Sequence, residues 1–260
     1  MTILDKIIKA QKELVAKQKA AIYRFVNKSE YMDREGYSLR RALVESSQFG
    51  IISEYKRQSP SKGIINDHSD IIETTTGYQK NGAAALSILT NEEFFGGKTE
   101  DILQARPHVS IPILRKEFIV HEIQIEEAKA MGADAILLIA ACLTKQEVNT
   151  FAKKAKLLDL EVLMEVHTKE ELSKTSPYLD VIGVNNRNLK NFSVDINTSL
   201  DLLPFISNDF AKISESGISN AEAIRTLWKA GFQGFLVGEQ FMKTEHPPTR
   251  LAQLILEITK

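Results

Sequence analysis

Short apolar runs rich in isoleucine, valine and leucine recur along the chain from residue 51 onward. A polar turn and a segment with helical spacing follow each run. Strands buried on both faces have continuous apolar sequences of this kind, because helices cover both sides of a parallel sheet. The pattern therefore predicts alternating strands and helices. The predicted strands are Ile51–Tyr55, Ala83–Leu89, Ile111–Arg115, Ala135–Ala141, Glu161–Val166, Val181–Asn185, Ala211–Glu215 and Gly234–Gly238.

Helix boundaries are marked chemically in several of these units. Capping boxes, in which a hydroxyl and a glutamate three residues later bind each other's backbone, predict helix starts at Thr144, Thr168 and Ser219. Glycines that can adopt a left-handed conformation predict helix ends at Gly82, Gly132 and Gly231. Eight such units favour closure into a (β/α)8 TIM barrel over an open doubly wound sheet. The first strand also lacks a dinucleotide-binding glycine fingerprint after it, which weakens the open-sheet alternative.

Residues 1–48 follow a different pattern. Apolar residues recur at helical spacing among lysines from Ile3 through Leu14 and Val15, which predicts an amphipathic helix. A second helix is predicted to start near Ser38. We therefore expect one barrel domain over residues 1–260, in which 1–48 form an N-terminal helical extension. A cover for one barrel end or a flap over the active site is favoured over a docking surface for a partner protein.

Composition narrows the possible partners. The chain has 33 basic and 34 acidic side chains, so no overall charge attracts nucleic acid or an anionic membrane. The single cysteine, Cys142, excludes an internal disulfide framework, and the histidines show no metal-ligand spacing. The longest apolar run, Ala135 to Leu143, is too short to cross a bilayer, and the N-terminus becomes charged too early for a secretory signal. We expect a cytoplasmic, monomeric protein without metal or cofactor.

In a barrel of this class, the active site lies where the strands end and their loops begin. Lys116 ends an otherwise apolar strand, and alternation places it on one face with Leu114 and Phe118, opposite Arg115 and Glu117. Other predicted strands also bring polar groups to this end. These are Glu54 and Lys56 from the first, Glu165 from the fifth, Asn185 and Arg187 from the sixth, and Glu215 from the seventh. Their shared position indicates a catalytic site rather than separate solvated charges.

The last two strands end in glycine. Ser216-Gly217 and Gly238 stand where many barrels bind a phosphate through backbone N–H groups, and glycine allows the anion to approach closely. Arg187 would add a fork of donors to the same anion. The alternative interpretation is that both glycines only permit tight turns.

These strand ends resemble the indole-3-glycerol-phosphate synthase family, and the likeness covers nearly the whole chain. It rests on the stretches Ile52–Gly63 (ISEYKRQSPSKG), Leu114–Ile119 (LRKEFI), Leu163–Val166 (LMEV), Ile182–Leu189 (IGVNNRNL) and Ser214–Ile218 (SESGI). The resemblance implies a barrel with an N-terminal helical extension and a role in tryptophan biosynthesis. It also implies a phosphorylated substrate, 1-(2-carboxyphenylamino)-1-deoxyribulose 5-phosphate, which undergoes ring closure, decarboxylation and dehydration. Association with other enzymes of that pathway would also be consistent with it.

The chemistry of this reaction suggests roles for the strand-end residues. Lys116 would be the acid for ring closure, Glu165 would stabilise the cationic intermediate and move protons, and Lys56 and Glu54 would be the acid and base for dehydration. Lys56 could instead bind the substrate carboxylate or phosphate. The cationic intermediate is itself the electron sink, so no cofactor is expected. The remaining expected contacts are Asn185 and Glu215 with sugar hydroxyls, Arg187, Ser216, Gly217, Gly238 and Ser59 with the substrate or its phosphate, and Phe94, Phe95 and Phe118 with the aromatic ring.

Two positions depart from the family pattern. Glu117 stands where aspartate is usual, and Glu239 follows Gly238 where many members carry serine. We expect both carboxylates to face away from the substrate, since an acidic group beside a phosphate dianion would repel it. Two other functions remain as alternatives. A phosphosugar isomerase would need a cysteine–aspartate or aspartate–aspartate couple, and a catalytically silent barrel would bind its ligand without turnover.

Overall fold

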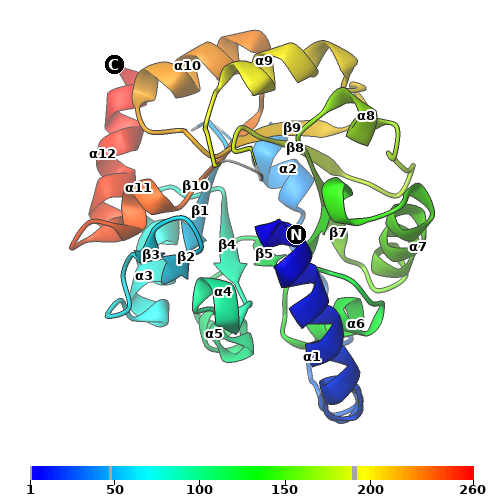
Figure 1. The fold of residues 1–260 in the computed structure, drawn as a ribbon. Helices are drawn as coiled ribbons and strands as arrows, with labels where there is room; N and C mark the ends of the chain where they lie inside the picture. Colours follow the sequence, from blue (N-terminus) through cyan, green and yellow to red (C-terminus); the bar gives the residue numbers. More distant parts are fainter. Residues whose placement is uncertain (1, 47–48, 189–191) are drawn as a thin grey trace.

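The computed structural model describes residues 2–46, 49–188 and 192–260. Eight parallel strands close into a barrel in the order β1-β10-β9-β8-β7-β6-β5-β4, with helices around it (Figure 1). The predicted (β/α)8 TIM barrel is therefore confirmed. The barrel strands are β1 Ile51–Tyr55, β4 Ala85–Leu89, β5 Ile113–Lys116, β6 Ala135–Ile139, β7 Glu161–Val166, β8 Val181–Asn185, β9 Ala211–Glu215 and β10 Gly234–Val237.

Half of the predicted strands have the observed limits, and the other half differ by one or two residues at one or both ends. The predicted run to Ala141 was too long because residues 140–142 form the 3₁₀ helix η2, Ala140–Cys142. Lys116 ends β5, as expected, and the strand begins at Ile113, two residues after the start of the predicted run. A short hairpin between β1 and the next helix, β2 Gln58–Ser59 with β3 Gly63–Ile64, was not predicted, since its strands are too short to show alternation.

Helices surround the barrel on its outer face. They are α3 Ile71–Lys80, α4 Glu92–Phe95, α5 Thr99–Ala105, α6 Ile123–Ala130, α7 Lys145–Lys156, α8 Lys169–Leu172, α9 Asn197–Leu202, α10 Ala221–Ala230, α11 Glu239–Met242 and α12 Pro247–Thr259, with the 3₁₀ helices η1 Arg106–His108 and η3 Leu203–Phe205. Among the residues that the structure describes, no helix combines the length and apolarity needed to cross a membrane.

Most of the helix ends predicted from capping residues and glycines are confirmed. Thr144 and Thr168 are N-caps, and their hydroxyls accept from the backbone N–H groups of Glu147 and Glu171. The start at Ser219 was wrong by one residue, because the Asn220 side chain caps α10 by accepting from the backbone N–H of Ala223. The three predicted terminal glycines, Gly82, Gly132 and Gly231, all have positive φ.

Two helices precede the barrel. Helix α2, Leu39–Val44, closes the amino-terminal end of the strands, and its fully buried Leu39 and Leu43 join the apolar interior of the barrel. Helix α1, Ile3–Val26, packs on α6 and places its N-terminal end over the middle of the ring in Figure 1. Val15 is buried as predicted, whereas Leu14 is 42% exposed, because it lies beside the buried stripe of the helix.

A buried carboxylate attaches the N-terminal extension to the barrel. Asp134, directly before β6, pairs with Arg34 from the extension and with Arg106 from η1, whose Nη1 lies 2.7 Å from Oδ2. The same carboxylate accepts from the backbone N–H groups of Tyr37 and Ile113, both at 2.8 Å. Because Asp134 and Arg106 are almost fully buried, this cluster is only weakly screened by solvent.

We predict that Asp134→Ala lowers the free energy of unfolding by about 3–5 kcal/mol, because it leaves a buried guanidinium without its counter-charge. Urea denaturation followed by circular dichroism measures this loss. Asp33→Ala removes an exposed aspartate from the same extension and is the matched control. Equal stability of the two variants would show that the Asp134 cluster does not hold the extension in place.

Candidate active site

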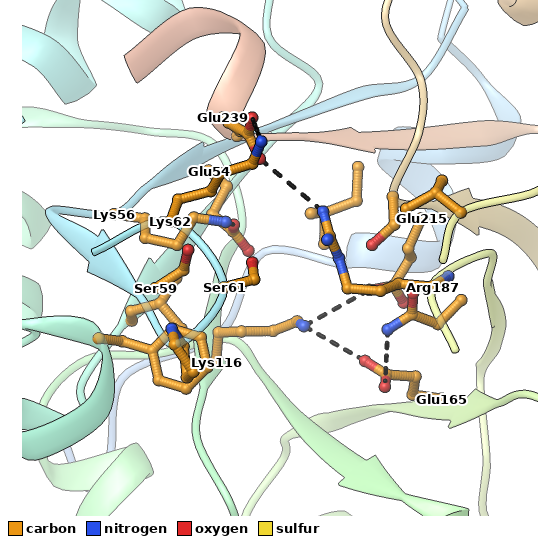
Figure 2. A pocket seen from close by; sticks show the side chains of 18 of the residues that line it. Glu54, Lys56, Ser59, Ser61, Lys62, Lys116, Glu165, Arg187, Glu215 and Glu239 are labelled. Atoms are coloured by element: carbon orange, nitrogen blue, oxygen red, sulfur yellow. Dashed lines mark hydrogen bonds and ion pairs between the residues drawn. The ribbon is translucent and has the colours of Figure 1, made fainter. Parts of the chain in front are cut away.

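A pocket of about 530 Å³ opens at the carboxyl ends of the barrel strands (Figure 2). Every site residue chosen from the sequence lines it, with the exception of Phe94. These residues are Glu54, Lys56, Ser59, Lys116, Phe118, Glu165, Asn185, Arg187, Glu215, Ser216, Gly217 and Gly238. The parallel sheet explains the gathering, because all of its strands end at the same rim.

Lys116 lies at the centre of the charged part of the pocket. Its Nζ is 3.3 Å from Glu165 Oε2 and 3.5 Å from Glu215 Oε2. Burial alone would lower the pKa of Lys116, but the negative charges of Glu165, Glu215 and Glu54 outweigh it and raise the pKa above its ordinary value. Lys116 is therefore held as an ammonium among carboxylates.

Glu165 and Glu215 share this ammonium but differ in protonation. Burial acts to raise the pKa of both groups. For Glu165 the charges of Lys116 and His167 and a 3.0 Å hydrogen bond from Asn185 Nδ2 prevail, so its pKa is lowered. For Glu215, burial and the nearby carboxylates of Glu165 and Glu54 prevail over Lys116 and raise its pKa to about 7. The pocket thus contains one carboxylate that is ionised at neutral pH and one that is ready to exchange a proton.

Glu54 and Lys56 form the second acid–base couple. Lys56 Nζ lies 2.7 Å from Glu54 Oε1, and Ser87 Oγ donates to Glu54 Oε2 at 3.2 Å. Burial acts to raise the pKa of Glu54, but the charges of Lys56 and Lys116 lower it overall. The backbone of the last strand also makes room for this carboxylate, because a Cβ on Gly238 would lie 2.6 Å from Glu54 Oε1.

Backbone geometry shapes the predicted anion end of the pocket. Ser216 and Gly217 both have positive φ, of 64° and 73°, and a Cβ on Gly217 would lie 2.3 Å from Val194 Cγ1. Asn186 holds this turn by donating to the Ser216 carbonyl at 3.0 Å, and its side-chain oxygen accepts from Ser199. The turn is therefore fixed before any ligand arrives.

Glu239 does not face outward as expected. Its carboxylate lines the pocket, 3.8 Å from Arg187 Nη2 and 3.9 Å from Lys62 Nζ, and Figure 2 shows it turned toward both cations. The expectation failed because it considered only repulsion by a bound anion. Arg187 and Lys62, the two cations at this end of the pocket, attract the carboxylate of Glu239.

Glu117 borders the pocket but turns its charge away from the central cluster. Its carboxylate accepts from Thr90 Oγ1 at 2.9 Å, Asn91 Nδ2 at 3.1 Å and the backbone N–H of Phe118 at 2.9 Å. Burial raises the pKa of Glu117. The group thus joins the ends of β4 and β5.

The other end of the pocket is apolar. Phe118 contacts Phe95, with ring centroids 6.0 Å apart and planes inclined by 36°, and Phe95 lines the pocket where Phe94 does not. The two phenylalanines are neighbours in the single turn of α4, so they point in different directions. The first turns of α1 also contribute Ile3, Leu4 and Ile7 to the lining.

Several lining residues were missed from the sequence. The position of Lys62 within the ISEYKRQSPSKG stretch was a usable signal. The apolar face of α1 was recognised, but periodicity does not show which surface such a face covers. Gly183 in β8, within the IGVNNRNL stretch, does not line the pocket but supports it: a Cβ there would lie 2.2 Å from Glu215 Oε1, so this glycine makes room for that carboxylate.

Among the residues that the structure describes, neither histidine nor cysteine lines the pocket. Across residues 2–46, 49–188 and 192–260, no group of three or more His, Cys, Asp or Glu could hold a metal ion. Cys142 does not line the pocket, and burial raises the pKa of its thiol to about 12. The cysteine that the isomerase alternative would use therefore lies outside the lining of this pocket.

The chain is similar to known proteins along nearly its whole length. Residues 4–254 match the family model of indole-3-glycerol phosphate synthase. The indole-3-glycerol phosphate synthase of Bacteroides thetaiotaomicron is 48% identical over 221 residues, 85% of each chain. That of Variovorax paradoxus is 40% identical over 261 residues, covering 97% of this chain and 98% of its relative.

Solved structures share the fold at low sequence identity. A chain of the tryptophan synthase a2b2 complex of Pyrococcus furiosus has a TM-score of 0.60 and 16% identity, over 82% of this chain and 98% of that one. The native KDPGal structure has a TM-score of 0.58 and 14% identity, over 82% and 94%. These likenesses support the barrel fold alone.

We predict that Glu239→Gln tightens binding of inorganic phosphate about fivefold, because it removes a partly exposed carboxylate that competes for Arg187 and Lys62. Isothermal titration calorimetry at neutral pH measures the dissociation constant. Glu245→Gln, an exposed glutamate beyond α11, is the matched control. Unchanged or weaker phosphate binding in Glu239→Gln would contradict this competition.

Proposed function

The chain belongs to the indole-3-glycerol phosphate synthase family, and we propose that the cluster around Lys116 catalyses the ring closure of this tryptophan-pathway reaction. The substrate would be 1-(2-carboxyphenylamino)-1-deoxyribulose 5-phosphate, and the enzyme would act as a carboxy-lyase that also releases water. The observation that carries this proposal is the Lys116 ammonium within 3.5 Å of Glu165 and Glu215, between an apolar and a cationic end of one pocket.

The polarity of the pocket matches the substrate from end to end. The aromatic ring of the substrate would lie against Phe95, Phe118 and the first turns of α1. Its phosphate would bind at the Ser216-Gly217 turn and Gly238 and exchange places with the carboxylate of Glu239. The pocket volume of about 530 Å³ lies within the usual range for small-molecule sites.

The steps of the reaction follow from this placement. As the aryl carbon attacks the ketone, negative charge develops on the ketone oxygen, and Lys116 donates its proton there. A developing alkoxide is more basic than the amine, so the raised pKa of Lys116 does not prevent this transfer. The cationic ring nitrogen formed on closure then accepts the electron pair left by carbon dioxide. Glu165 stabilises that cation as an ionised carboxylate.

Dehydration uses the second couple. Lys56 would protonate the hydroxyl that leaves as water, and Glu54 would take the proton lost from the methylene carbon beside the nitrogen. The 2.7 Å contact between Lys56 Nζ and Glu54 Oε1 favours this assignment over binding of the substrate carboxylate by Lys56. Asn185 would orient Glu165 through the hydrogen bond already present and reach a sugar hydroxyl.

Turnover of the carboxyphenylamino-deoxyribulose phosphate is the direct test. The purified chain should convert it to a product with indole absorbance and fluorescence. Well-folded protein that binds this compound without forming the indole would support the catalytically silent alternative and overturn the proposed function.

We predict that Lys116→Met lowers kcat/KM by about a thousandfold or more, since it keeps the apolar stem and removes the proton donor. The indole fluorescence assay measures the loss, and circular dichroism checks the fold. Lys153→Met, an exposed lysine on α7, is the control. Near-normal turnover by Lys116→Met would remove the acid role from this residue.

We predict that Glu165→Gln lowers kcat about a hundredfold while KM changes little, because the amide keeps the shape but loses the charge that stabilises the cation. Steady-state kinetics over a range of substrate concentrations separates the two constants. A change confined to KM would instead assign Glu165 to substrate binding.

A further inference from the structure

His167 follows β7 and lies behind the catalytic cluster. Its Nε2 is 3.4 Å from Glu165 Oε1, and its Nδ1 is 3.4 Å from Glu171 Oε2. The side chain is only 11% exposed, yet neither ring nitrogen forms a hydrogen bond within the part of the chain that the structure describes. Such unsatisfied buried groups are rare. The ring is therefore placed between two carboxylates without being fixed in one orientation.

A second cavity lies on the far side of His167. It measures about 520 Å³ and is lined by His167 and Glu171 together with residues of the β8 loop. Leu4, Asn185 and Arg187 line both this side cavity and the active-site pocket, whereas His167 lines only the side cavity. Glu165 lines only the pocket. The contact between His167 and Glu165 therefore joins the side cavity to the active-site pocket.

The proposed reaction requires a proton from solvent. Two protons join the former ketone oxygen, which leaves as water, and one proton leaves the methylene carbon. The substrate carboxylate departs as neutral carbon dioxide, so each turnover takes up one net proton. The first turns of α1 contribute to the lining of the substrate pocket, so bound substrate would be enclosed between α1 and the barrel. A proton route that does not pass through the substrate would therefore be useful.

We propose that His167 and Glu171 form a proton relay that carries this proton from the side cavity to Glu165. This proposal rests on the proposed role of Glu165. In each turnover, the relay moves one proton from the side cavity toward the active site. Glu171 takes up a proton from solvent in the side cavity. His167 receives a proton from Glu171 at Nδ1 and gives one from Nε2 to Glu165 Oε1. Glu165 Oε2 lies 3.3 Å from Lys116 Nζ and returns the proton to the amine that protonated the ketone. Since no hydrogen bond fixes the ring, it can then turn back to its starting tautomer.

The charges around His167 favour its protonated form. Burial acts to lower the pKa of His167, but the adjacent carboxylate of Glu171 and the charges of Glu165 and Glu215 raise the pKa above its ordinary value overall. A group with a raised pKa loses its proton only as the pH rises through that pKa, so the relay should fail at the alkaline side of the pH range. Asp5, Arg187 and Asp195 also line this side cavity, Lys116 lies beyond Glu165, and Cys142 and Lys174 lie near Glu171.

His167→Gln tests the relay, because the amide fills similar space and cannot carry a proton between the carboxylates. We expect kcat to fall about tenfold, with KM within about twofold, and the alkaline limb of the kcat–pH profile to change. In His167→Ala, added imidazole should restore part of kcat. Unchanged kcat and an unchanged profile in His167→Gln would overturn the relay, as would a loss that imidazole does not restore in His167→Ala.

Glu171→Gln tests the outer half of the relay. Losing this carboxylate lowers the pKa of His167, so the alkaline limb of kcat should move to lower pH by about one unit. Glu170→Gln, the exposed neighbour on the same helix, is the matched control and should keep the wild-type profile. Identical profiles for both variants would contradict the relay. Failure of the proposed function is distinguishable, because the wild-type chain would then form no indole product at all.

Discussion

The structure depends on one lysine buried among carboxylates. Moving the Lys116 ammonium out of water is costly, and only the negative charges of Glu165, Glu215 and Glu54 compensate for it. Burial of Glu215, together with the nearby charges of Glu165 and Glu54, outweighs the attraction of Lys116 and raises the pKa of Glu215 to about 7. The cluster is therefore a reservoir of exchangeable protons rather than a simple ion pair.

The barrel beneath the cluster keeps these charges at fixed distances. Inward-facing and outward-facing residues alternate along each strand, so the last inward-facing residue, such as Lys116 in β5 or Glu165 in β7, is the one that reaches the pocket. Below the charges, Leu114, Leu163 and Leu236 form an apolar layer that Leu39 and Leu43 of α2 extend to the opposite end. This packing is dense, so the carboxylates cannot withdraw downward from the lysine.

Much of this arrangement could be predicted from local sequence. Buried parallel strands are continuous apolar runs, and Lys116, Glu165 and Glu215 were found because each lies at the end of such a run or one residue before it. What failed depends on contacts between distant segments. The direction of Glu239 is decided by Arg187 and Lys62, which belong to other loops. The choice of Phe95 over Phe94 depends on the orientation of a single helical turn, which no periodicity can establish from so short a segment.

The position of His167 follows from its place in the sequence. It lies two residues after Glu165, so strand alternation continued past Val166 places both side chains on the same side. Thr168 then starts α8, and the first turn of that helix brings Glu171 back to accept from the His167 backbone N–H at 2.6 Å. One strand end and one helix start thus align Glu165, His167 and Glu171 in a row. Because the row leads away from the substrate pocket, it can supply protons while the pocket itself is filled.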